Sequence, residues 1–312
     1  MPVEHNNIRY LERNEIDIEK WDQCIDRAPN GLIYAKSFVL DSLSKHWAAL
    51  VWNDYEIVMP LTWNKKFFIH YLYQPPFAAR LGVFGNISHP GIYKSFLANI
   101  PSKFLYIDIA LNEGNNEILN FIDQSFTVRK RQNLLLPLSG YEQVQNGYKR
   151  LAKRMIRKAT NHGISVQKEA GPEAIVDFYY EHYSHRHPHL SRRDYDRLIN
   201  LCRSKEGGKH IQCYRAISPE GEILAVYLLF SDSRYIYSVL GGSTGKGKAL
   251  GAFYLLTDAA LKNNCNMKKD FLFEGSDLQG IAFFDRQFGA FEVCFPHLMQ
   301  NRLPWPLKLF KQ

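Results

Sequence analysis

A glycine-rich stretch between an expected strand and an expected buried helix constrains this chain more than any other feature. The segment before it, Arg234 to Leu240, is β-branched and aromatic, which is typical of a strand. The segment after it, Ala249 to Asn264, is apolar on most faces and free of proline, which predicts a largely buried helix. Between them lie glycines, two hydroxyl residues and two lysines. Glycines let the backbone approach a ligand, and a helix start presents unpaired N–H groups, so this order predicts a phosphate-binding turn.

Three interpretations of this turn compete. The pattern Gly242-x-x-x-x-Gly247-Lys248 fits most of a nucleotide-binding P-loop, but Ala249 stands where a hydroxyl would hold Mg²⁺. The sequence therefore disfavours an NTPase. An exposed basic loop without a ligand and a cradle for the pyrophosphate of an acyl carrier both remain open.

The residues after the helix favour the acyl carrier. We expect Asp270 to Glu274 to form a short strand that ends in a carboxylate. A helix should follow, because its apolar residues fall at helical spacing and a glycine stands where a C-cap is expected: Ile281, Phe284, Phe288 and then Gly289.

This stretch resembles the C-terminal module of FemAB-like proteins, a branch of the GNAT superfamily of N-acyltransferases. The resemblance rests on Phe273-Glu274-Gly275-Ser276, Gly280-Ile281-Ala282-x-Phe284 and Phe288-Gly289-Ala290. In the first half of the chain, Gln74-Pro75-Pro76-Phe77 and Leu81-Gly82-Val83-Phe84 resemble the same group, so the likeness covers most of the chain. The peptidoglycan-building Fem ligases look like Asp-Phe-x-Gly where this chain has Phe-Glu-Gly-Ser, so the resemblance names neither donor nor acceptor.

The length of 312 residues suits two domains. Glycine and proline cluster at Leu138 to Tyr141, and the strand pattern stops there, so we expect domains at 1–138 and 139–312. The first half shows a strand, two helices, a meander and a further helix and strand. The predicted fold class is α/β (α+β), with two GNAT-like modules, each a mixed, mostly antiparallel sheet flanked by helices.

The composition indicates which ligands and which cellular compartment to expect. The net charge of +8 favours an anionic ligand, although a solvated basic surface would give the same figure. Five scattered cysteines without metal-ligand spacing predict free thiols in a reducing compartment. The first residues, Met1 to Asn7, are polar, and no apolar run is long enough to cross a bilayer, so we expect a cytoplasmic protein without a membrane span.

The densest charge feature lies on a helix expected from Gln143 to His162. Its apolar residues fall at spacings of three or four, and its other faces carry six cations without an acid: Lys149, Arg150, Lys153, Arg154, Arg157 and Lys158. A solvated helix face usually mixes charge signs to form i,i+4 pairs. We therefore expect this group to face an anion, either the phosphates of an acyl carrier or a tRNA backbone.

The segment His182 to His189 contains four histidines. Their spacing matches no helical metal-ligand pair, and no cysteine or carboxylate cluster adjoins them, so we expect a polar loop and no metal site. One of these histidines lining an acceptor pocket remains open.

The expected reaction is transfer of an acyl or aminoacyl group to an amine, with acyl-CoA or aminoacyl-tRNA as co-substrate and no covalently bound cofactor. The acceptor amine attacks the donor carbonyl directly, so the enzyme needs a base, a polarised carbonyl and an anchor for the carrier.

The catalytic candidates are Glu274, as the base or the holder of the acceptor ammonium, and Ser276, to place a donor or water. The candidates for holding the carrier are Ser243, Thr244, Gly245, Lys246, Gly247 and Lys248. The candidates for holding substrate are Tyr148, Arg150, Arg154, Arg157, Gln74, Phe77 and Tyr237.

Two alternatives stay open. Glu274 could instead cap the following helix or pair with Arg286. The chain could also be a non-catalytic GNAT-like protein that binds RNA or an anionic glycan through a basic cleft, whereas DNA is not an expected partner. No Ser–His–Asp or Cys–His pattern supports hydrolase chemistry.

Overall fold

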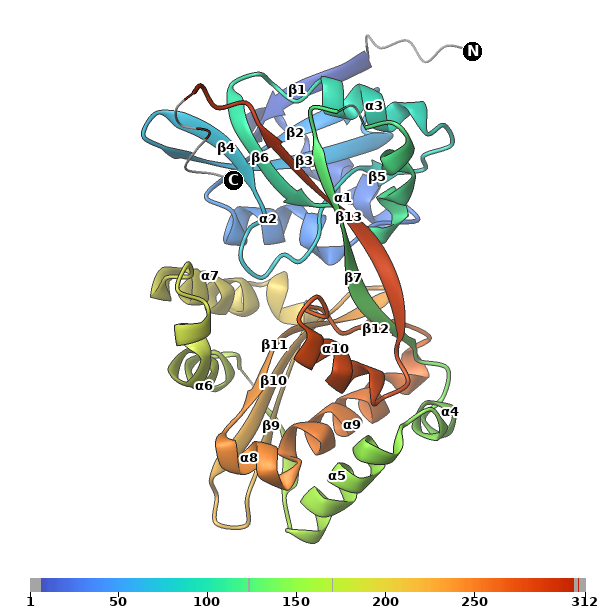
Figure 1. Ribbon diagram of the computed structural model, residues 1–312, viewed down its shortest axis with the longest axis vertical. Coiled ribbons are helices and arrows are strands. Elements are labelled where there is room, and N and C mark those ends of the chain that lie inside the picture. The colour runs from blue at the N-terminus through green and yellow to red at the C-terminus, as the bar shows by residue number, and fades with distance from the viewer. Residues whose placement is uncertain (1–6, 123, 170, 306–307, 309–312) are drawn as a thin grey trace. The chain divides into compact units, whose positions relative to one another are not determined.

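The computed structural model describes residues 7–122, 124–169, 171–305 and 308 (Figure 1). The chain forms two compact units, Met1–Arg131 with Cys294–Gln312 (unit 1) and Gln132–Val293 (unit 2). The sequence-based boundary placed all of 139–312 in one domain. In the structure the last strand begins in unit 2 and ends in unit 1, because its final residues pair with a strand of the first half.

Unit 1 is built around a mixed sheet. Its strands follow the order β1-β2-β3-β4-β6-β13, and β5 pairs with β3. β4 and β6 are parallel, and the other described pairs are antiparallel. The elements are β1 (Ile8–Glu12), α1 (Ile18–Arg27), α2 (Ser37–Leu43), β2 (His46–Trp52), β3 (Ile57–Lys66), β4 (Ile69–Tyr73), β5 (Phe84–Gly85), α3 (Gly91–Ala98), β6 (Phe104–Ala110) and the end of β13 (Phe291–Asn301).

Both faces of the unit 1 sheet are covered. Ala48 and Leu50 of β2 pack with Phe96 of α3 in one core cluster. The alternate residue Trp47 points to the other face, where its ring lies 5.1 Å from that of Trp21 on α1. α1 begins after Asp17, whose carboxylate caps the helix by accepting a hydrogen bond from the Lys20 N–H.

The strands of unit 2 follow the order β7-β12-β11-β10-β9-β8. β11 and β12 are parallel, and the other described pairs are antiparallel. The elements are β7 (Thr127–Pro137), which begins in unit 1, α4 (Tyr141–Asn146), α5 (Arg150–Asn161), β8 (Ser165–Glu169), α6 (Glu173–Tyr183), α7 (Arg192–Arg203), β9 (Ile211–Ile217), β10 (Ile223–Ser231), β11 (Tyr235–Ser243), α8 (Gly245–Leu250), α9 (Ala252–Asn264), β12 (Asp270–Leu272) and α10 (Gln279–Arg286).

The central strand β10 is apolar along almost its whole length because helices cover both faces of the sheet. Figure 1 shows α6 and α7 on one side of β9, β10 and β11, and α5, α9 and α10 on the other. Tyr227 and Leu229 pack in the same cluster as Leu256 of α9. Each unit thus has a mostly antiparallel sheet with one parallel pair and flanking helices, which confirms the predicted fold class.

Two expected continuous helices are each broken at a glycine. The helix predicted over 143–162 is divided into α4 and α5 around Gly147, where a Cβ would lie 3.9 Å from the Gly289 Cα. The helix predicted over 249–264 begins earlier, as α8, and breaks at Gly251 (φ +82°) before α9. A Cβ on Gly251 would lie 2.5 Å from the Met155 carbonyl oxygen, so this break lets α5 pack closely on the start of α9.

No described helix combines the length and the apolar character that crossing a bilayer requires.

Gly251→Ala should destabilise unit 2 by about 2 kcal/mol or more, because a left-handed backbone and a backbone clash act together. Gly245→Ala is the matched control in the same segment, since a Cβ there meets nothing within 4 Å. Urea unfolding followed by circular dichroism measures both. Equal stabilities of the two variants would contradict the assigned role of Gly251.

Candidate functional site

The feature that organises unit 2 is an opening between two parallel strands. β11 and β12 pair only from Tyr235↔Asp270 to Tyr237↔Leu272. β12 then stops, whereas β11 continues to Ser243 with β10 as its partner. Within that continuation the β10 register skips Val239, which is a β-bulge, a device that re-aims backbone groups and recurs next to active sites. The carboxyl ends of both strands face the same edge, where ligands of α/β sheets commonly bind.

The equivalent place in unit 1 is closed. There the parallel strands β4 and β6 stay paired up to Tyr73↔Asp108. Beyond this pair the Gln74 side chain links the two segments. Its Nε2 donates to the Ala78 carbonyl oxygen at 2.5 Å, and its Oε1 accepts from the Ala110 N–H at 3.1 Å. The structure thus places Gln74 and the half-buried Phe77 in unit 1, where Gln74 joins strand ends. The open pair of strands belongs to unit 2.

The glycine-rich turn of unit 2 is more ordered than a loop. Gly241 to Ser243 are the end of β11, and Gly245 begins the short helix α8. Thr244 caps this helix, because its Oγ1 accepts from the Gly247 N–H at 2.9 Å. Gly247 packs against β10, since a Cβ there would lie 2.2 Å from the Leu224 carbonyl oxygen. Gly245 borders open space, so its glycine leaves the first turn of α8 accessible.

The two lysines of the turn lie in different surroundings. Lys246 is exposed, and its Nζ forms an ion pair with Glu222 at 2.6 Å, which raises the pKa of Lys246. An exposed pair of this kind is weak, so an anionic ligand can compete with Glu222 for the lysine. The Lys248 Nζ lies 5.6 Å from the centre of the Tyr183 ring, a cation–π distance.

Tyr183 belongs to this site although the sequence did not indicate it. Its hydroxyl donates to the Ser243 carbonyl oxygen at 2.6 Å and accepts from the Ser243 N–H at 2.9 Å. The Tyr183 ring packs directly on Gly242, and only glycine leaves room for it, because a Cβ on Gly242 would lie 2.5 Å from a carbon of the ring. Tyr183 therefore fixes the end of β11, and the only sequence signal for it was its place within the histidine segment, His182 to His189.

Glu274 stands where β12 ends, in a strained backbone. Its φ is +51° and that of Gly275 is +69°, and non-glycine residues in this region are concentrated at functional sites. Its side chain is buried, and Asn133 of β7 holds it from two directions. The Glu274 N–H donates to the Asn133 Oδ1 at 3.0 Å, and the Asn133 Nδ2 donates to the Glu274 Oε2 at 3.4 Å.

A second buried carboxyl group, Asp285 of α10, lies beside Glu274. The fully buried Ser276 donates from its Oγ to the Asp285 Oδ2 at 2.9 Å. Burial is the main cause that raises the pKa of Asp285 well above its usual range, and the Glu274 charge adds to it, while Ser276 and Arg286 act in the opposite direction. Ser276 thus connects the turn after β12 to α10. Asn133 and Asp285, like Tyr183, are site residues that sequence reasoning missed.

The register of the strands relates Glu274 to the glycine-rich turn. The last β11–β12 pair is Tyr237↔Leu272, and Glu274 follows it by two residues. β11 continues for six residues beyond that pair, to Ser243, which is about 20 Å at roughly 3.3 Å per residue. Because the two strands are parallel, Glu274 and the start of α8 both follow the carboxyl ends of neighbouring strands, and the start of α8 lies further along the strand direction.

Two residues predicted to hold substrate lie in the core. Tyr148 is buried, and its hydroxyl donates to the Asp258 Oδ1 at 2.9 Å, which joins the start of α5 to α9. Tyr237 is also buried, and its hydroxyl donates to the Asp232 carboxylate. Their aromatic rings pack inside unit 2.

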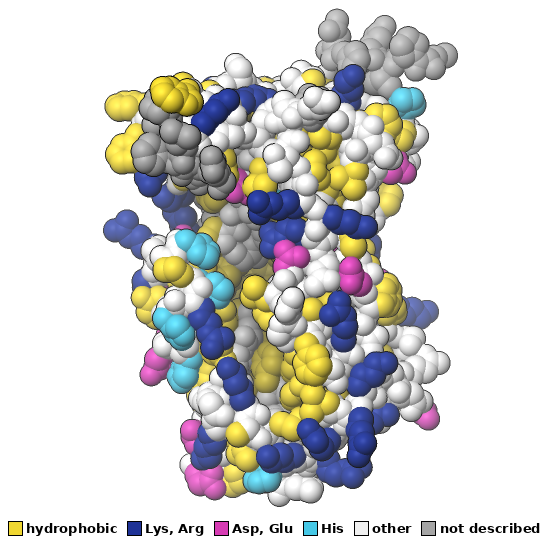
Figure 2. All heavy atoms as spheres, viewed as in Figure 1, with side chains coloured by type: hydrophobic (Ala, Val, Ile, Leu, Met, Phe, Trp, Pro, Cys, Tyr) yellow, Lys and Arg dark blue, Asp and Glu magenta, His cyan; other side chains and the backbone are white. Residues whose placement is uncertain are grey.

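The basic residues of α5 remain on the surface as the sequence predicts. Figure 2 shows Lys and Arg side chains gathered at the end of unit 2 that carries this helix. All six are exposed: Lys149, Arg150, Lys153, Arg154, Arg157 and Lys158. Among the residues that the structure describes, none of the six forms an ion pair with an acid. Lys158 instead donates to the Ala249 carbonyl oxygen in α8 at 2.9 Å, so the basic face adjoins the helix that follows the glycine-rich turn.

The histidine segment folds into a short 3₁₀ turn, Ser184–Arg186, and a following loop. The rings of Tyr179 and His187 are stacked, and the Tyr179 hydroxyl lies 3.1 Å from the His187 Nε2. Across the described chain, no three His, Cys, Asp or Glu side chains are grouped so as to hold a metal ion.

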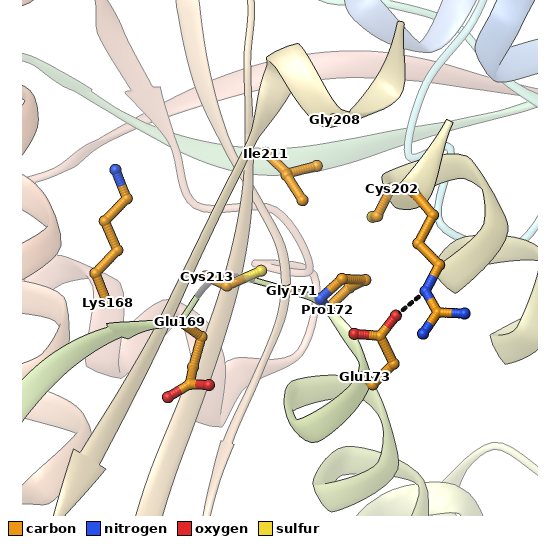
Figure 3. A pocket seen from close by; sticks show the side chains of 10 residues that line it. Lys168, Glu169, Gly171, Pro172, Glu173, Cys202, Gly208, Ile211 and Cys213 are labelled. Atoms are coloured by element: carbon orange, nitrogen blue, oxygen red, sulfur yellow. Dashed lines mark ion pairs between the residues drawn. The ribbon is translucent and has the colours of Figure 1, made fainter. Parts of the chain in front are cut away.

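A cavity of about 690 Å³ lies at the opposite edge of the unit 2 sheet (Figure 3). β8, β9 and the ends of α6 and α7 line it, and none of the predicted site residues does. Its charges are largely paired, since Glu173 forms an ion pair with Arg203 and Glu169 with Arg215. Burial raises the pKa of Cys213 to about 12, so this thiol stays protonated at neutral pH. All five cysteines of the chain are free.

Comparisons with known proteins support the fold. No family model matches the sequence, and no curated protein sequence matches it. Among solved structures, FemX is 12% identical with a TM-score of 0.69, covering 97% of this chain and 99% of FemX. L-PGS from Bacillus licheniformis is 12% identical with a TM-score of 0.55, covering 94% and 95%. A tandem GNAT protein from the clavulanic acid biosynthesis pathway is 11% identical with a TM-score of 0.54, covering 95% and 99%. The chain thus has the two-module fold of FemX and tandem GNAT proteins, which confirms the expected FemAB-like GNAT architecture.

The raised pKa of Asp285 predicts a pH dependence of stability. The native state holds the proton more tightly than the unfolded chain, so the contribution to stability is complete below the ordinary value of about 4 and is lost as the pH rises through the raised native pKa. Asp285→Asn cannot ionise, so its free energy of unfolding should rise relative to that of the wild type as the pH increases from about 4 towards the raised native pKa, by about 1.4 kcal/mol per pH unit. Urea unfolding at several pH values measures this. Asp196→Asn, which removes a half-exposed carboxylate on α7, is the control and should show no such trend. Parallel profiles of wild type and Asp285→Asn would contradict the prediction.

Proposed function

We propose that unit 2 transfers an acyl or aminoacyl group from a carrier to an amine acceptor. The observation that carries the proposal is the opening between β11 and β12, with the start of α8 at one end and the buried Glu274 at the other. An extended carrier whose anionic end and reactive carbonyl are far apart suits this spacing. Acyl-CoA and the acceptor end of an aminoacyl-tRNA both have that shape.

The carrier's phosphates would bind at the first turn of α8. The first N–H groups of any helix lack intrahelical partners, and the dipole favours a negative charge there. Gly245 leaves this turn accessible, and Lys246 and Lys248 supply charge. Ser243 and Thr244 hold the turn in shape through Tyr183 and the Gly247 N–H.

The chemistry needs one proton removed and one supplied. An acceptor ammonium loses its proton to Glu274, and the free amine nitrogen then attacks the donor carbonyl carbon. The new C–N bond forms, the carrier's C–S or C–O bond breaks, and the carrier leaves after taking up a proton. Burial raises the pKa of Asp285, which disfavours a second negative charge beside Glu274. Ser276 acts as a positioning residue, because it connects the Glu274 turn to α10.

Two features bear on the donor. The tandem GNAT neighbour is named in a form without AcCoA, which directs the first tests towards acyl-CoA. The exposed basic face of α5 adjoins α8, which suits a carrier with a longer phosphate backbone. We therefore keep both donors in the proposal and separate them by experiment.

Acetyl-CoA should stabilise the protein, raising the Tm by roughly 3 to 8 °C at about 100 times the Kd. Lys246→Ala/Lys248→Ala should lose most of this shift, because the anchoring charges are removed. Glu274→Gln should keep it, because the acyl group and not the anchor lies near Glu274. Differential scanning fluorimetry with acetyl-CoA and with CoA measures the shift.

The control for that experiment is Lys205→Ala/Lys209→Ala, which removes two exposed lysines at the other edge of unit 2, one of them paired with Glu206 as Lys246 is with Glu222. It should retain the full shift. A shift that is the same in all variants, or no shift at any concentration, would remove acyl-CoA as the donor.

A second candidate function, binding of RNA without catalysis, is favoured by the six exposed cations from Lys149 to Lys158, none of which forms an ion pair with a described acid. Arg150→Ala/Arg154→Ala/Arg157→Ala should weaken binding of a tRNA and lower the slope of log K against log salt by roughly 2. Fluorescence anisotropy at several salt concentrations measures the slope, with Lys205→Ala/Lys209→Ala as the control. An unchanged slope would exclude α5 as the RNA-binding face.

A further inference from the structure

The β3–β4 hairpin of unit 1 ends in two exposed phenylalanines. The register pairs Lys66 with Ile69, so Phe67 and Phe68 form a two-residue turn. Phe67 is 82% exposed and Phe68 is 89% exposed. Figure 1 shows this hairpin projecting from unit 1. Adjacent apolar side chains at a hairpin tip mark an interaction surface, because folding gains nothing from leaving them in water.

The backbone of this turn is one that phenylalanine disfavours. φ is +47° at Phe67 and +67° at Phe68, which is the pattern of a type I′ turn. Such turns strongly prefer Asn-Gly, because bulky side chains crowd the backbone when φ is positive. The chain therefore keeps two phenylalanines at a position where local structure favours other residues. A binding role at the tip accounts for this conflict.

Two lysines flank the phenylalanines. The Lys65 Nζ lies 5.4 Å from the centre of the Phe68 ring, and the Lys66 Nζ lies 5.7 Å from that of Phe67. Both lysines are exposed, and no described acid forms an ion pair with either. The tip thus combines an apolar end with a positively charged collar.

A third exposed aromatic residue lies at the same edge of the unit 1 sheet. The start of β4 pairs with the start of β6 (His70↔Phe104), and the end of β13 pairs near the start of β6 (Asn301↔Tyr106). Trp305 follows Asn301 by four residues and is 78% exposed. Among the described residues, Phe67, Phe68 and Trp305 are the most exposed large hydrophobic side chains, and strand pairing brings their segments to one edge.

We propose that this edge of unit 1 is a docking surface for an anionic lipid bilayer, with Phe67, Phe68 and Trp305 inserting into the interfacial layer and Lys65 and Lys66 contacting lipid headgroups. Tryptophan concentrates at the membrane interface, where its ring is buried and its N–H stays hydrated, and phenylalanine adds a purely apolar ring that inserts beside it. Lysines next to an apolar anchor are attracted by the negative surface of acidic lipids. The protein as a whole carries a net charge of +8, which adds to this attraction.

The test is co-sedimentation of the full chain with vesicles of neutral phosphatidylcholine, with and without anionic phosphatidylglycerol. The wild type should bind the mixed vesicles and bind the neutral ones more weakly. Phe67→Asn/Phe68→Gly should reduce binding to mixed vesicles at least tenfold. The same variant should raise the Tm by roughly 2 °C or more, because Asn-Gly suits the turn. Lys65→Ser/Lys66→Ser should weaken binding by roughly fivefold for each lysine on mixed vesicles and little on neutral ones.

Phe291→Asn is the matched control, because it removes a half-exposed phenylalanine from another strand, and it should bind like the wild type. Quenching of Trp305 fluorescence by brominated acyl chains, lost in Trp305→Phe, should report insertion. Equal binding of wild type and Phe67→Asn/Phe68→Gly, or no binding of the wild type to anionic vesicles, would overturn the proposal. Self-association that this variant abolishes, without vesicle binding, would also overturn it, since the tip would then be an interface between copies of the chain.

Discussion

The constraint on which the site of unit 2 depends is the short reach of one pair of parallel strands. β11 and β12 pair through three residues and then separate, because β12 ends in a left-handed turn at Glu274 and Gly275 while β11 continues along β10. Extending the pairing would close the edge, as Gln74 helps to do for the corresponding strands of unit 1. The same two-strand arrangement thus gives a closed edge in one unit and an open edge in the other.

Several side chains hold the opening in place. Tyr183 binds both backbone groups of Ser243 and so replaces the missing neighbour at the end of β11. After β12, Asn133 has the same role for Glu274: its Oδ1 accepts from the Glu274 N–H, and its Nδ2 donates to the Glu274 carboxylate. Backbone groups at a strand end need partners when they are buried, and side chains from distant segments provide them here. The opening is therefore a stable feature of the fold.

The exposed hairpin of unit 1 is governed by a different rule. Local preference favours Asn-Gly at its turn, and the chain has Phe-Phe there instead. At this turn the residues present, Phe67 and Phe68, are not those that the backbone conformation favours, and this mismatch distinguishes the hairpin tip from the core of unit 1. It is also independent of the chemistry of unit 2, because Phe67 and Phe68 take no part in the carrier site.

The sequence by itself determined the local elements: the strand before the glycine-rich turn and the carboxylate after β12 follow from periodicity and turn residues within about ten positions of each other. The fold class followed from the order of such elements along the chain. Only the tertiary structure decided which groups meet. Asn133 and Glu274 are 141 residues apart in the chain, and Tyr183 and Ser243 are 60 apart. Likewise, the break at Gly251 lies where the Met155 backbone packs closely, and no local pattern records the approach of a distant backbone.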